Sequence, residues 1–362
     1  MSDGLSMPPY ERFDLNSIKQ LASQIGAAKR DQSDATWPSR QLQIMADAGV
    51  YRWFIPRSQG GWGWTAAELT DAYIELSAAC LSSTFVLTQR VAALKRIALS
   101  PNASLRDTLL PGLLNGQLVS TVGISHLTTS RQHVSRPVMG FEIEGGDFVL
   151  NGFCPWVTGA NDVSHVVVGA QGANEQILAA VPANSAGLTV DPGFQMIALT
   201  DTHTGAIRFD NVRVSADELL AGPNENVLSS LSAVSTGSYQ TSALALGVAQ
   251  AAIDYLQTEA QQRADVSSSA ASLRAQHDQL RESLLQVAGG NPVCSNEQIR
   301  TEANQLVLRA TQAAMVAAKG AGFVTTHPVG RWCQEALFFL VWSCPQAVRD
   351  ANLCELAGVR VD

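Results

Sequence analysis

The spacing of apolar residues changes twice along the chain. Up to about Leu118, apolar residues recur every three or four positions, which is the period of an amphipathic helix. The pattern predicts helices most clearly over residues 15–28, 39–48 and 65–80. The second of these stops at Gly49, a common helix terminator, and the third begins at Thr65, a favourable N-cap. The first part of the chain is therefore expected to be helical.

Between residue 119 and about residue 222 the period becomes two, which indicates β-strands. Gly, Asn and Asp residues separate the segments, as at the turn Gly145-Gly146. Strands are expected over residues 119–122, 141–143, 148–150, 163–168, 177–181, 188–190, 206–209 and 212–214. Strands and helices do not alternate here, which excludes a Rossmann domain and favours a small antiparallel barrel or sandwich.

After Pro223 the helical period returns. Helices are expected over residues 227–262, 270–287 and 295–319, and from about residue 331 onward. Long helices with short connections are typical of a bundle. The sequence thus predicts an α+β protein with an all-helical domain (1–118), a central antiparallel β-barrel or sandwich domain (119–222) and a C-terminal four-helix bundle (223–362).

Composition narrows the class of protein. Hydrophobic residues make up 46% of the chain, as in folded proteins, and charged residues only 15%, so part of the surface is expected to lie between subunits. The 24 basic and 32 acidic residues give a net charge of −8, which argues against a nucleic-acid partner. We find neither a secretory signal nor an apolar run of the roughly 20 residues that span a bilayer, so a cytoplasmic protein without a membrane partner is expected.

The six cysteines are scattered and form no pattern of metal ligands. No CxxC pair or histidine cluster accompanies them, which argues against a zinc site and against a disulfide framework. We therefore expect reduced, mostly buried thiols and no metal.

The segment over residues 151–162 is the most informative in the chain. Trp156 and Thr158 are two positions apart in a strand-like pattern, and side chains at that spacing share a face of a β-sheet. A flat apolar ring beside a hydroxyl suits a flat ligand with a polar edge. In isolation, a core Trp next to a strand Thr is the simpler interpretation, and the motifs elsewhere in the chain favour the ligand.

Five motifs follow one another in a fixed order. They are Pro56 with Gly60-Gly61, Asn151-Gly152 with Trp156-Val157-Thr158, Phe209 to Ser215, Ala245 to Arg263, and Gly320 to Arg331. Together they resemble the acyl-CoA dehydrogenase family of flavoproteins, and the resemblance spans nearly the whole chain. It implies a homotetramer that binds FAD between the β domain and the bundle. The implied reaction is dehydrogenation at the CH–CH group of an acyl thioester, with an electron-transfer flavoprotein as partner.

The resemblance also implies cofactor contacts. Trp156 would pack on the isoalloxazine ring, and Thr158 would hydrogen-bond near its N5 atom. Ser125 matches the family's flavin-facing Thr, and Ser130 matches its loop Ser. His126 follows Ser125 and is expected to have an ordinary structural role.

A second group of positions matches those through which a neighbouring subunit holds the pyrophosphate and adenosine of FAD. They are Arg263, Gln276 and Gly320. An Arg pairs well with phosphate oxygens, and a Gly allows a close approach of backbone to ligand.

The chain departs from the family at the catalytic base. The family removes a proton with a Glu that follows the "PVxR" motif, and here Ser343 occupies that position. The alternative base position on the first bundle helix falls in the window 235–238, which has no acid. A serine hydroxyl is a poor proton acceptor, so the catalytic residue is unknown from the sequence.

Three hypotheses follow. The first is a flavin oxidoreductase of the acyl-CoA dehydrogenase type whose proton acceptor lies elsewhere or belongs to the substrate. The second is a flavin monooxygenase of the same fold, which takes reduced flavin from a partner reductase and acts on a small hydrophobic compound. The third is a non-catalytic descendant that keeps the scaffold.

Overall fold

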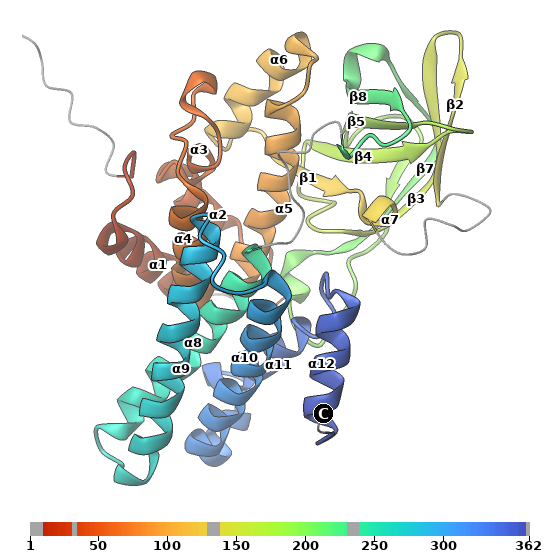
Figure 1. Cartoon of the computed structure of the whole chain (residues 1–362). Helices are drawn as coiled ribbons and strands as arrows, with labels where there is room; N and C mark the ends of the chain where they lie inside the picture. The colour runs from red at the N-terminus through yellow and green to blue at the C-terminus, as the bar shows by residue number, and fades with distance from the viewer. Residues whose placement is uncertain (1–9, 31–34, 129–137, 230–238, 360–362) are drawn as a thin grey trace, which may run out of the picture.

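The computed structural model of the chain describes residues 10–30, 35–128, 138–229 and 239–359 (Figure 1). The first part is helical. Its helices are α1 (Leu15–Arg30), α2 (Ser39–Asp47), α3 (Val50–Trp53), α4 (Ala66–Ala79), α5 (Leu81–Ala98) and α6 (Ala103–Leu114). Thr65 begins α4 in a capping box: its hydroxyl accepts from the Glu68 backbone N–H, and the Glu68 carboxylate accepts from the Thr65 backbone N–H.

The centre of the chain forms one sheet. Its strands are β1 (Ser120–Gly123), β2 (Met139–Glu144), β3 (Asp147–Val157), β4 (His165–Gln171), β5 (Gln176–Pro182), β6 (Leu188–Val190), β7 (Gly205–Val214) and β8 (Leu219–Asn224). Their order is β6-β7-β3-β2-β4-β5-β8, with β1 paired to β4. A short helix, α7 (Ser125–Thr128), follows β1.

The fold class predicted from the sequence is confirmed, with one correction to the central domain. The sheet is open and mixed, because β1 and β2 both pair with β4 in parallel, whereas an antiparallel barrel or sandwich was expected. The reason is local: β1 enters from α6 and α7 follows it, so β1 has no hairpin partner in sequence. An alternating pattern identifies a strand and does not specify the direction of its neighbour.

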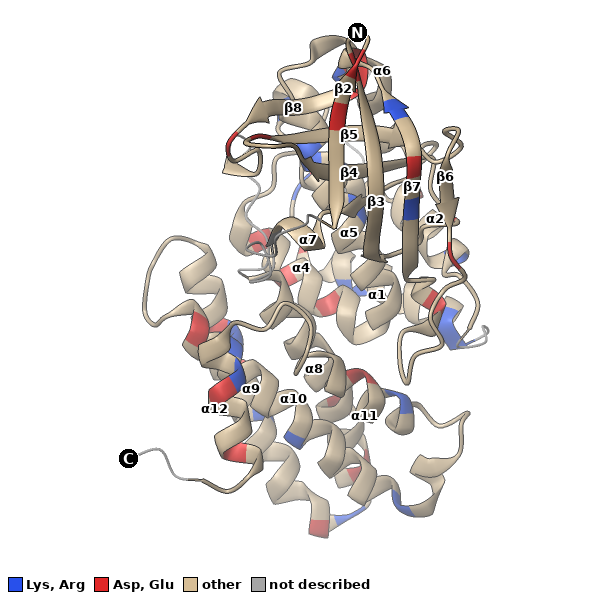
Figure 2. Cartoon of the chain, turned by 90° about the vertical axis from the view of Figure 1, so that its right-hand side faces the viewer, with Lys and Arg blue, Asp and Glu red and all other residues tan. Residues whose placement is uncertain are grey.

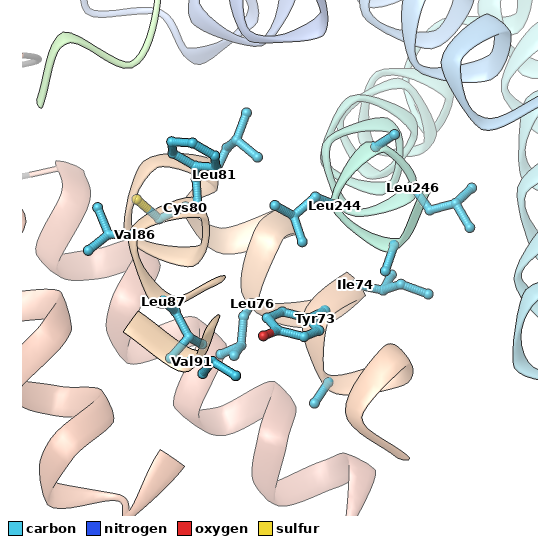
Figure 3. Close-up of a cluster of buried hydrophobic side chains, with 14 of the residues drawn as sticks. Tyr73, Ile74, Leu76, Cys80, Leu81, Val86, Leu87, Val91, Leu244 and Leu246 are labelled. Atoms are coloured by element: carbon cyan, nitrogen blue, oxygen red, sulfur yellow. The ribbon is translucent and has the colours of Figure 1, made fainter. Parts of the chain in front are cut away.

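The last part of the chain is helical again, with α8 (Gln240–Ala260), α9 (Ala264–Ala288), α10 (Asn296–Ala318), α11 (Pro328–Phe338) and α12 (Gln346–Leu356). Helices α8, α9 and α10 pack on one another, and α8 also packs on α4 of the first domain (Figure 1). Gly247 makes that contact close, since a Cβ there would lie 2.4 Å from the Ile74 carbonyl oxygen. Figure 3 shows the apolar side chains where α4, α5 and α8 meet, among them Tyr73, Leu87 and Leu244.

The two faces of the sheet belong to different apolar cores. Along β4, Val167 joins the core shared with the helices, while Val166 and Val168 join a second core on the opposite face of the sheet. Alternate residues of a strand point to opposite faces, so β4 is buried on both. Figure 2 shows acidic and basic residues interspersed over the molecule rather than gathered by sign.

Candidate functional site

The candidate site begins at the end of β3. Trp156 lies on this strand with 58% of its surface exposed, and its ring contacts that of Phe194 at a centroid distance of 4.7 Å. The register with β7 shifts between Cys154 and Val157, so a bulge bends the strand just where Trp156 stands. The strand ends at Val157, and the alternation used to place Trp156 and Thr158 on one face does not extend to Thr158.

Thr158 is buried, with 5% of its surface exposed, and its hydroxyl is part of a chain of three threonines. The Thr158 Oγ1 lies 3.1 Å from Thr204 Oγ1, which lies 2.8 Å from Thr202 Oγ1. The Thr202 hydroxyl donates to the carbonyl oxygen of Leu199 over 2.7 Å. The hydroxyl singled out from the sequence therefore connects to a polar path into the interior.

The inner end of this path lies on the short 3₁₀ helix η3 (Thr200–Thr202). The backbone is left-handed on both sides of η3, with φ of 63° at Leu199 and 45° at His203, and non-glycine residues adopt such angles only where surrounding contacts hold them. One such contact is a buried ion pair between Lys29 Nζ and Asp201 Oδ2 at 2.9 Å. This pair connects η3 to α1 and fixes the position of the turn.

Ser125 lies on a segment adjacent to β3. It begins α7 two residues after Gly123, whose carbonyl oxygen accepts from the Cys154 thiol of β3 over 3.2 Å. The structure thus places the Ser125 segment beside β3. Ser130 lies outside the described residues.

His126 has a structural contact rather than an exposed ring. Its Nε2 lies 2.8 Å from the Gly169 carbonyl oxygen of β4, so Nε2 carries the proton in that bond. Burial lowers the pKa of His126 below its ordinary value, and the hydrogen bond to Gly169 opposes that shift. The neutral imidazole thus connects α7 to β4, in agreement with the structural role expected from the sequence.

Arg263 lies where α9 begins, and Gly320 lies just after the end of α10. Arg263 precedes α9, and its Nη1 donates to the Ala317 carbonyl oxygen over 2.7 Å. Its guanidinium also pairs with the carboxylates of Glu259 (3.3 Å) and Asp265 (3.1 Å). Gly320 stands three residues beyond Ala317, and a Cβ there would meet nothing within 4 Å.

Gln276 lies further along α9. Its amide donates to the Ser272 carbonyl oxygen over 3.2 Å and accepts from Arg309 of α10 over 3.3 Å. It lines a cavity of about 420 Å³ between these two helices. In the described part of the chain, no hydrogen bond, ion pair or ring contact joins Arg263, Gln276 or Gly320 to Trp156 or Thr158. Among the described residues, the structure therefore shows no such contact between the two predicted groups.

Ser343 is exposed, in the turn that joins α11 to α12, with a φ of 45°. The preceding residue, Trp342, stacks on Phe338 at 5.1 Å and meets the edge of Phe85 at 5.0 Å. Arg300 of α10 donates to the Trp342 carbonyl oxygen over 2.9 Å and so holds the turn. The buried carboxylate of Glu335 on α11 lies 3.5 Å from Arg331, and Glu335 stands eight residues before Ser343.

A second cavity, of about 690 Å³, lies between residues 58–60 and α6, where Arg52 and Arg106 line it. Among the described residues, no group of three or more His, Cys, Asp or Glu side chains is placed to hold a metal ion. Within the same ranges, no helix has the length and apolar character to cross a membrane.

Residues 17–117 match the family model described as "Acyl-CoA dehydrogenase, N-terminal domain". The probable acyl-CoA dehydrogenase YngJ of Bacillus subtilis (strain 168) is 26% identical over 271 residues, which are 71% of this chain and 70% of that relative. The resemblance to the acyl-CoA dehydrogenase family is confirmed. A glutaryl-CoA dehydrogenase from Mycobacterium smegmatis, solved in complex with FADH2, shares the fold with a TM-score of 0.79 at 18% identity, covering 97% of this chain and 96% of its own.

The acyl-CoA dehydrogenase-like relatives include a protein with a different activity. Dibenzothiophene monooxygenase of Rhodococcus erythropolis is 26% identical over 209 residues, which are 56% of this chain and 49% of that relative. The relatives therefore include both a probable acyl-CoA dehydrogenase and a monooxygenase.

Sequence reasoning missed the residues that surround Thr158. Thr202, Thr204 and Asp201 stand in a stretch without apolar periodicity, so no strand or helix was expected there. The one available signal was the run Thr200-Asp201-Thr202-His203-Thr204, which is unusually rich in hydroxyl groups for a connection between strands.

Proposed function

We propose that this protein binds FAD and is a flavin-dependent oxidoreductase of the acyl-CoA dehydrogenase type. The observation that carries the proposal is the end of β3, where the Trp156 ring is 58% exposed next to the buried hydroxyl of Thr158. An exposed Trp offers a large flat surface for stacking, and a hydroxyl held by its own partners gives a fixed polar contact. Bound FAD would supply the two-electron redox chemistry.

Chain residues would hold the cofactor in two places. Trp156 would pack on the isoalloxazine ring, with Thr158 and Ser125 at its polar edge. Arg263, Gln276 and Gly320 would serve the pyrophosphate and adenosine of a neighbouring subunit's FAD, which agrees with the lack of a contact between them and Trp156 among the described residues of one chain. A homotetramer, as the family resemblance implies, would bring the two groups together. Ser130 would complete the flavin-facing loop.

Ser343 limits the reaction that we propose. A positioned general base contributes about 10²- to 10⁴-fold to a proton abstraction, and a neutral serine cannot replace it. We therefore expect slow dehydrogenation of ordinary saturated acyl-CoA thioesters, and a substrate whose CH–CH group is more acidic or that carries its own base. An electron-transfer flavoprotein would accept the electrons.

Ser343→Glu tests this limit directly. The new carboxylate is expected to raise the rate of flavin reduction by a saturated acyl-CoA by about 10²-fold or more, measured anaerobically by the loss of flavin absorbance. Ser343→Gln, of the same size and without a charge, is the control and should stay at the wild-type rate. Rapid reduction of the wild-type flavin by a saturated acyl-CoA would show that the base lies elsewhere in the chain.

A second candidate function is a flavin-dependent monooxygenase that uses reduced flavin from a partner reductase. One observation supports it: dibenzothiophene monooxygenase is among the relatives. The expected replacement of the family's base by Ser343 points in the same direction. The experiment that separates the candidates supplies the purified protein with reduced flavin and oxygen, then with acyl thioesters under anaerobic conditions. Oxygen incorporation into a hydrophobic compound supports the monooxygenase, and thioester-dependent flavin reduction supports the dehydrogenase.

A further inference from the structure

The three threonine hydroxyls next to the candidate flavin site form a chain with a defined end. Thr158, Thr204 and Thr202 are all buried, with 5%, 7% and 0% of their surfaces exposed. Their Oγ1 atoms are separated by 3.1 Å and 2.8 Å, and the last one lies 2.7 Å from the Leu199 carbonyl oxygen. Two oxygens this close repel unless a proton lies between them, so each of the three contacts needs one hydroxyl proton.

The direction of each hydrogen bond between the threonines follows from the last contact, between Thr202 and Leu199. A carbonyl oxygen can only accept, so the Thr202 hydroxyl must donate to Leu199. The single proton of Thr202 is then used, and Thr204 must donate to Thr202. By the same argument Thr158 must donate to Thr204. Each hydroxyl has one proton and two lone pairs, so Thr158 keeps only lone pairs for any ligand outside the chain.

The backbone around the chain holds these hydroxyls in place. The Gly159 backbone N–H donates to the Thr202 carbonyl oxygen over 2.9 Å, which joins the residue after Thr158 to η3. Asp201, which directly precedes Thr202 in the sequence, is anchored by its 2.9 Å ion pair with Lys29, and both side chains are 3% exposed. Rotation of Thr202 away from Leu199 would leave a buried hydroxyl without an acceptor, which is unfavourable.

We propose that Thr202 and Thr204 are positioning residues that fix Thr158 as a hydrogen-bond acceptor toward the flavin, so that the site favours reduced flavin over oxidised flavin. The N5 atom of oxidised flavin carries a lone pair and can only accept, whereas N5 of reduced flavin carries a hydrogen and can donate. An acceptor-only Thr158 complements the reduced form alone. This inference rests on the proposed function, since it places Thr158 next to N5.

The test measures the midpoint potential of bound FAD by equilibration with a reference dye, together with the dissociation constants of oxidised and reduced FAD. Thr202→Val is the decisive variant because Thr202 does not contact Thr158. Without Thr202 as acceptor, Thr204 can donate to Thr158, and Thr158 can then donate to oxidised N5. We expect the ratio of reduced to oxidised affinity to fall about tenfold, which lowers the potential by about 30 mV for a two-electron couple.

Thr204→Val should lower the potential in the same direction, because it releases the Thr158 proton directly. Thr204→Ser keeps the hydroxyl and should leave the potential at the wild-type value. Thr200→Val is the matched control: its hydroxyl lies on the same turn and donates to the Met196 carbonyl oxygen over 2.9 Å, outside the chain. It should also leave the potential unchanged.

The outcomes separate this inference from the proposed function. A wild-type protein that binds neither FAD nor FMN overturns both. Wild type that binds flavin, with a Thr202→Val potential equal to that of wild type or higher, overturns only the inference. If Thr202→Val does not fold, the pair Thr204→Val and Thr204→Ser decides the same question, since equal potentials in that pair contradict the direction of the chain.

Discussion

Trp156 is the residue on which the proposed flavin contact depends most. A Trp ring in an aromatic contact contributes about 0.5–1.5 kcal/mol beyond the burial of its area. We therefore expect Trp156→Ala to raise the dissociation constant of FAD about tenfold, measured by fluorescence titration of the apoprotein. Trp156→Phe keeps an aromatic ring and should lose less. An unchanged dissociation constant in Trp156→Ala would mean that the flavin does not lie at the end of β3.

Two neighbouring carboxylates would weaken the proposed contact between Arg263 and a phosphate. Its guanidinium is shared between Glu259 and Asp265, and the hydrogen bond with Arg263 lowers the pKa of the Asp265 carboxyl below its ordinary value. A phosphate would have to compete with two carboxylates for one guanidinium.

Removing the Asp265 charge should therefore strengthen FAD binding. We expect Asp265→Asn to lower the dissociation constant of FAD several-fold, with a weaker effect on FMN, because FMN lacks the pyrophosphate and adenosine. Salt should reduce the difference between the variant and wild type, since the site is exposed. Equal gains for FAD and FMN would show that Arg263 does not contact the pyrophosphate.

The sequence suggested single residues of the candidate site but not their surroundings. The ring of Trp156 is exposed and the Ser125 segment lies beside β3, while the contacts of both residues with flavin stay predictions. The threonine chain could not be predicted. It depends on a turn whose left-handed φ at Leu199 and His203 is set by tertiary contacts such as Lys29–Asp201, and no local pattern encodes those.

Among the elements, helix α9 carries a buried titratable group. His277 lies on its inner face and is fully buried, and its Nδ1 is 3.1 Å from the Asp278 carboxylate. Burial lowers the pKa of His277 below its ordinary value, and the nearby carboxylate of Asp278 opposes that shift while the Arg274 charge adds to it. The unfolded chain therefore binds this proton more tightly than the folded chain does.

For that reason we expect the free energy of unfolding of the protein to decrease in mild acid. As the pH falls through about 6.5, the ordinary value for histidine, unfolding takes up the proton and the free energy of unfolding decreases, by at most about 1.4 kcal/mol per pH unit. His277→Leu removes the titration and should flatten the decrease between pH 7.5 and 5.5, measured by urea unfolding. A variant whose free energy of unfolding falls as steeply as that of wild type would refute the assignment to His277.

Helices and strands could be predicted from the sequence where only one face of the helix or strand is buried. The helix expected over residues 15–28 corresponds to α1, whose buried residues follow the helical period. Helix α5 lies in the region predicted to be helical, but its bounds were not predicted. It is buried along nearly its whole length, so polar and apolar residues do not alternate around it. Strand β8 was missed because Gly222-Pro223 is typical of the end of a strand. In the structure β8 lies at the edge of the sheet, where Pro is tolerated.

At the scale of the whole molecule, the far end of the bundle exposes a set of large apolar side chains. Phe323 is 83% exposed, Val316 77% and Val324 55%, and all three lie close in sequence to Gly320. Apolar side chains gathered on one surface mark contacts with other chains. In the proposed homotetramer this end would meet the neighbouring subunit whose FAD Arg263 contacts.

Phe323→Asp tests this assembly. A carboxylate in the subunit contact should convert the tetramer into smaller particles, measured by light scattering, and lower FAD retention at the same time. Ile143→Asp is the control: Ile143 is also an exposed apolar side chain, 57% exposed, and lies on β2 away from the bundle. Full FAD content in a Phe323→Asp monomer would show that each chain binds its cofactor without a neighbour.

The absorption spectrum of the purified wild-type protein shows directly whether the chain binds flavin. We expect a yellow protein whose extracted cofactor is FAD, and whose flavin is released on denaturation in a stoichiometry near one per chain. A colourless protein that also fails to bind added FAD would contradict the flavin site at Trp156 and Thr158, and would leave the chain as a scaffold that has lost its cofactor.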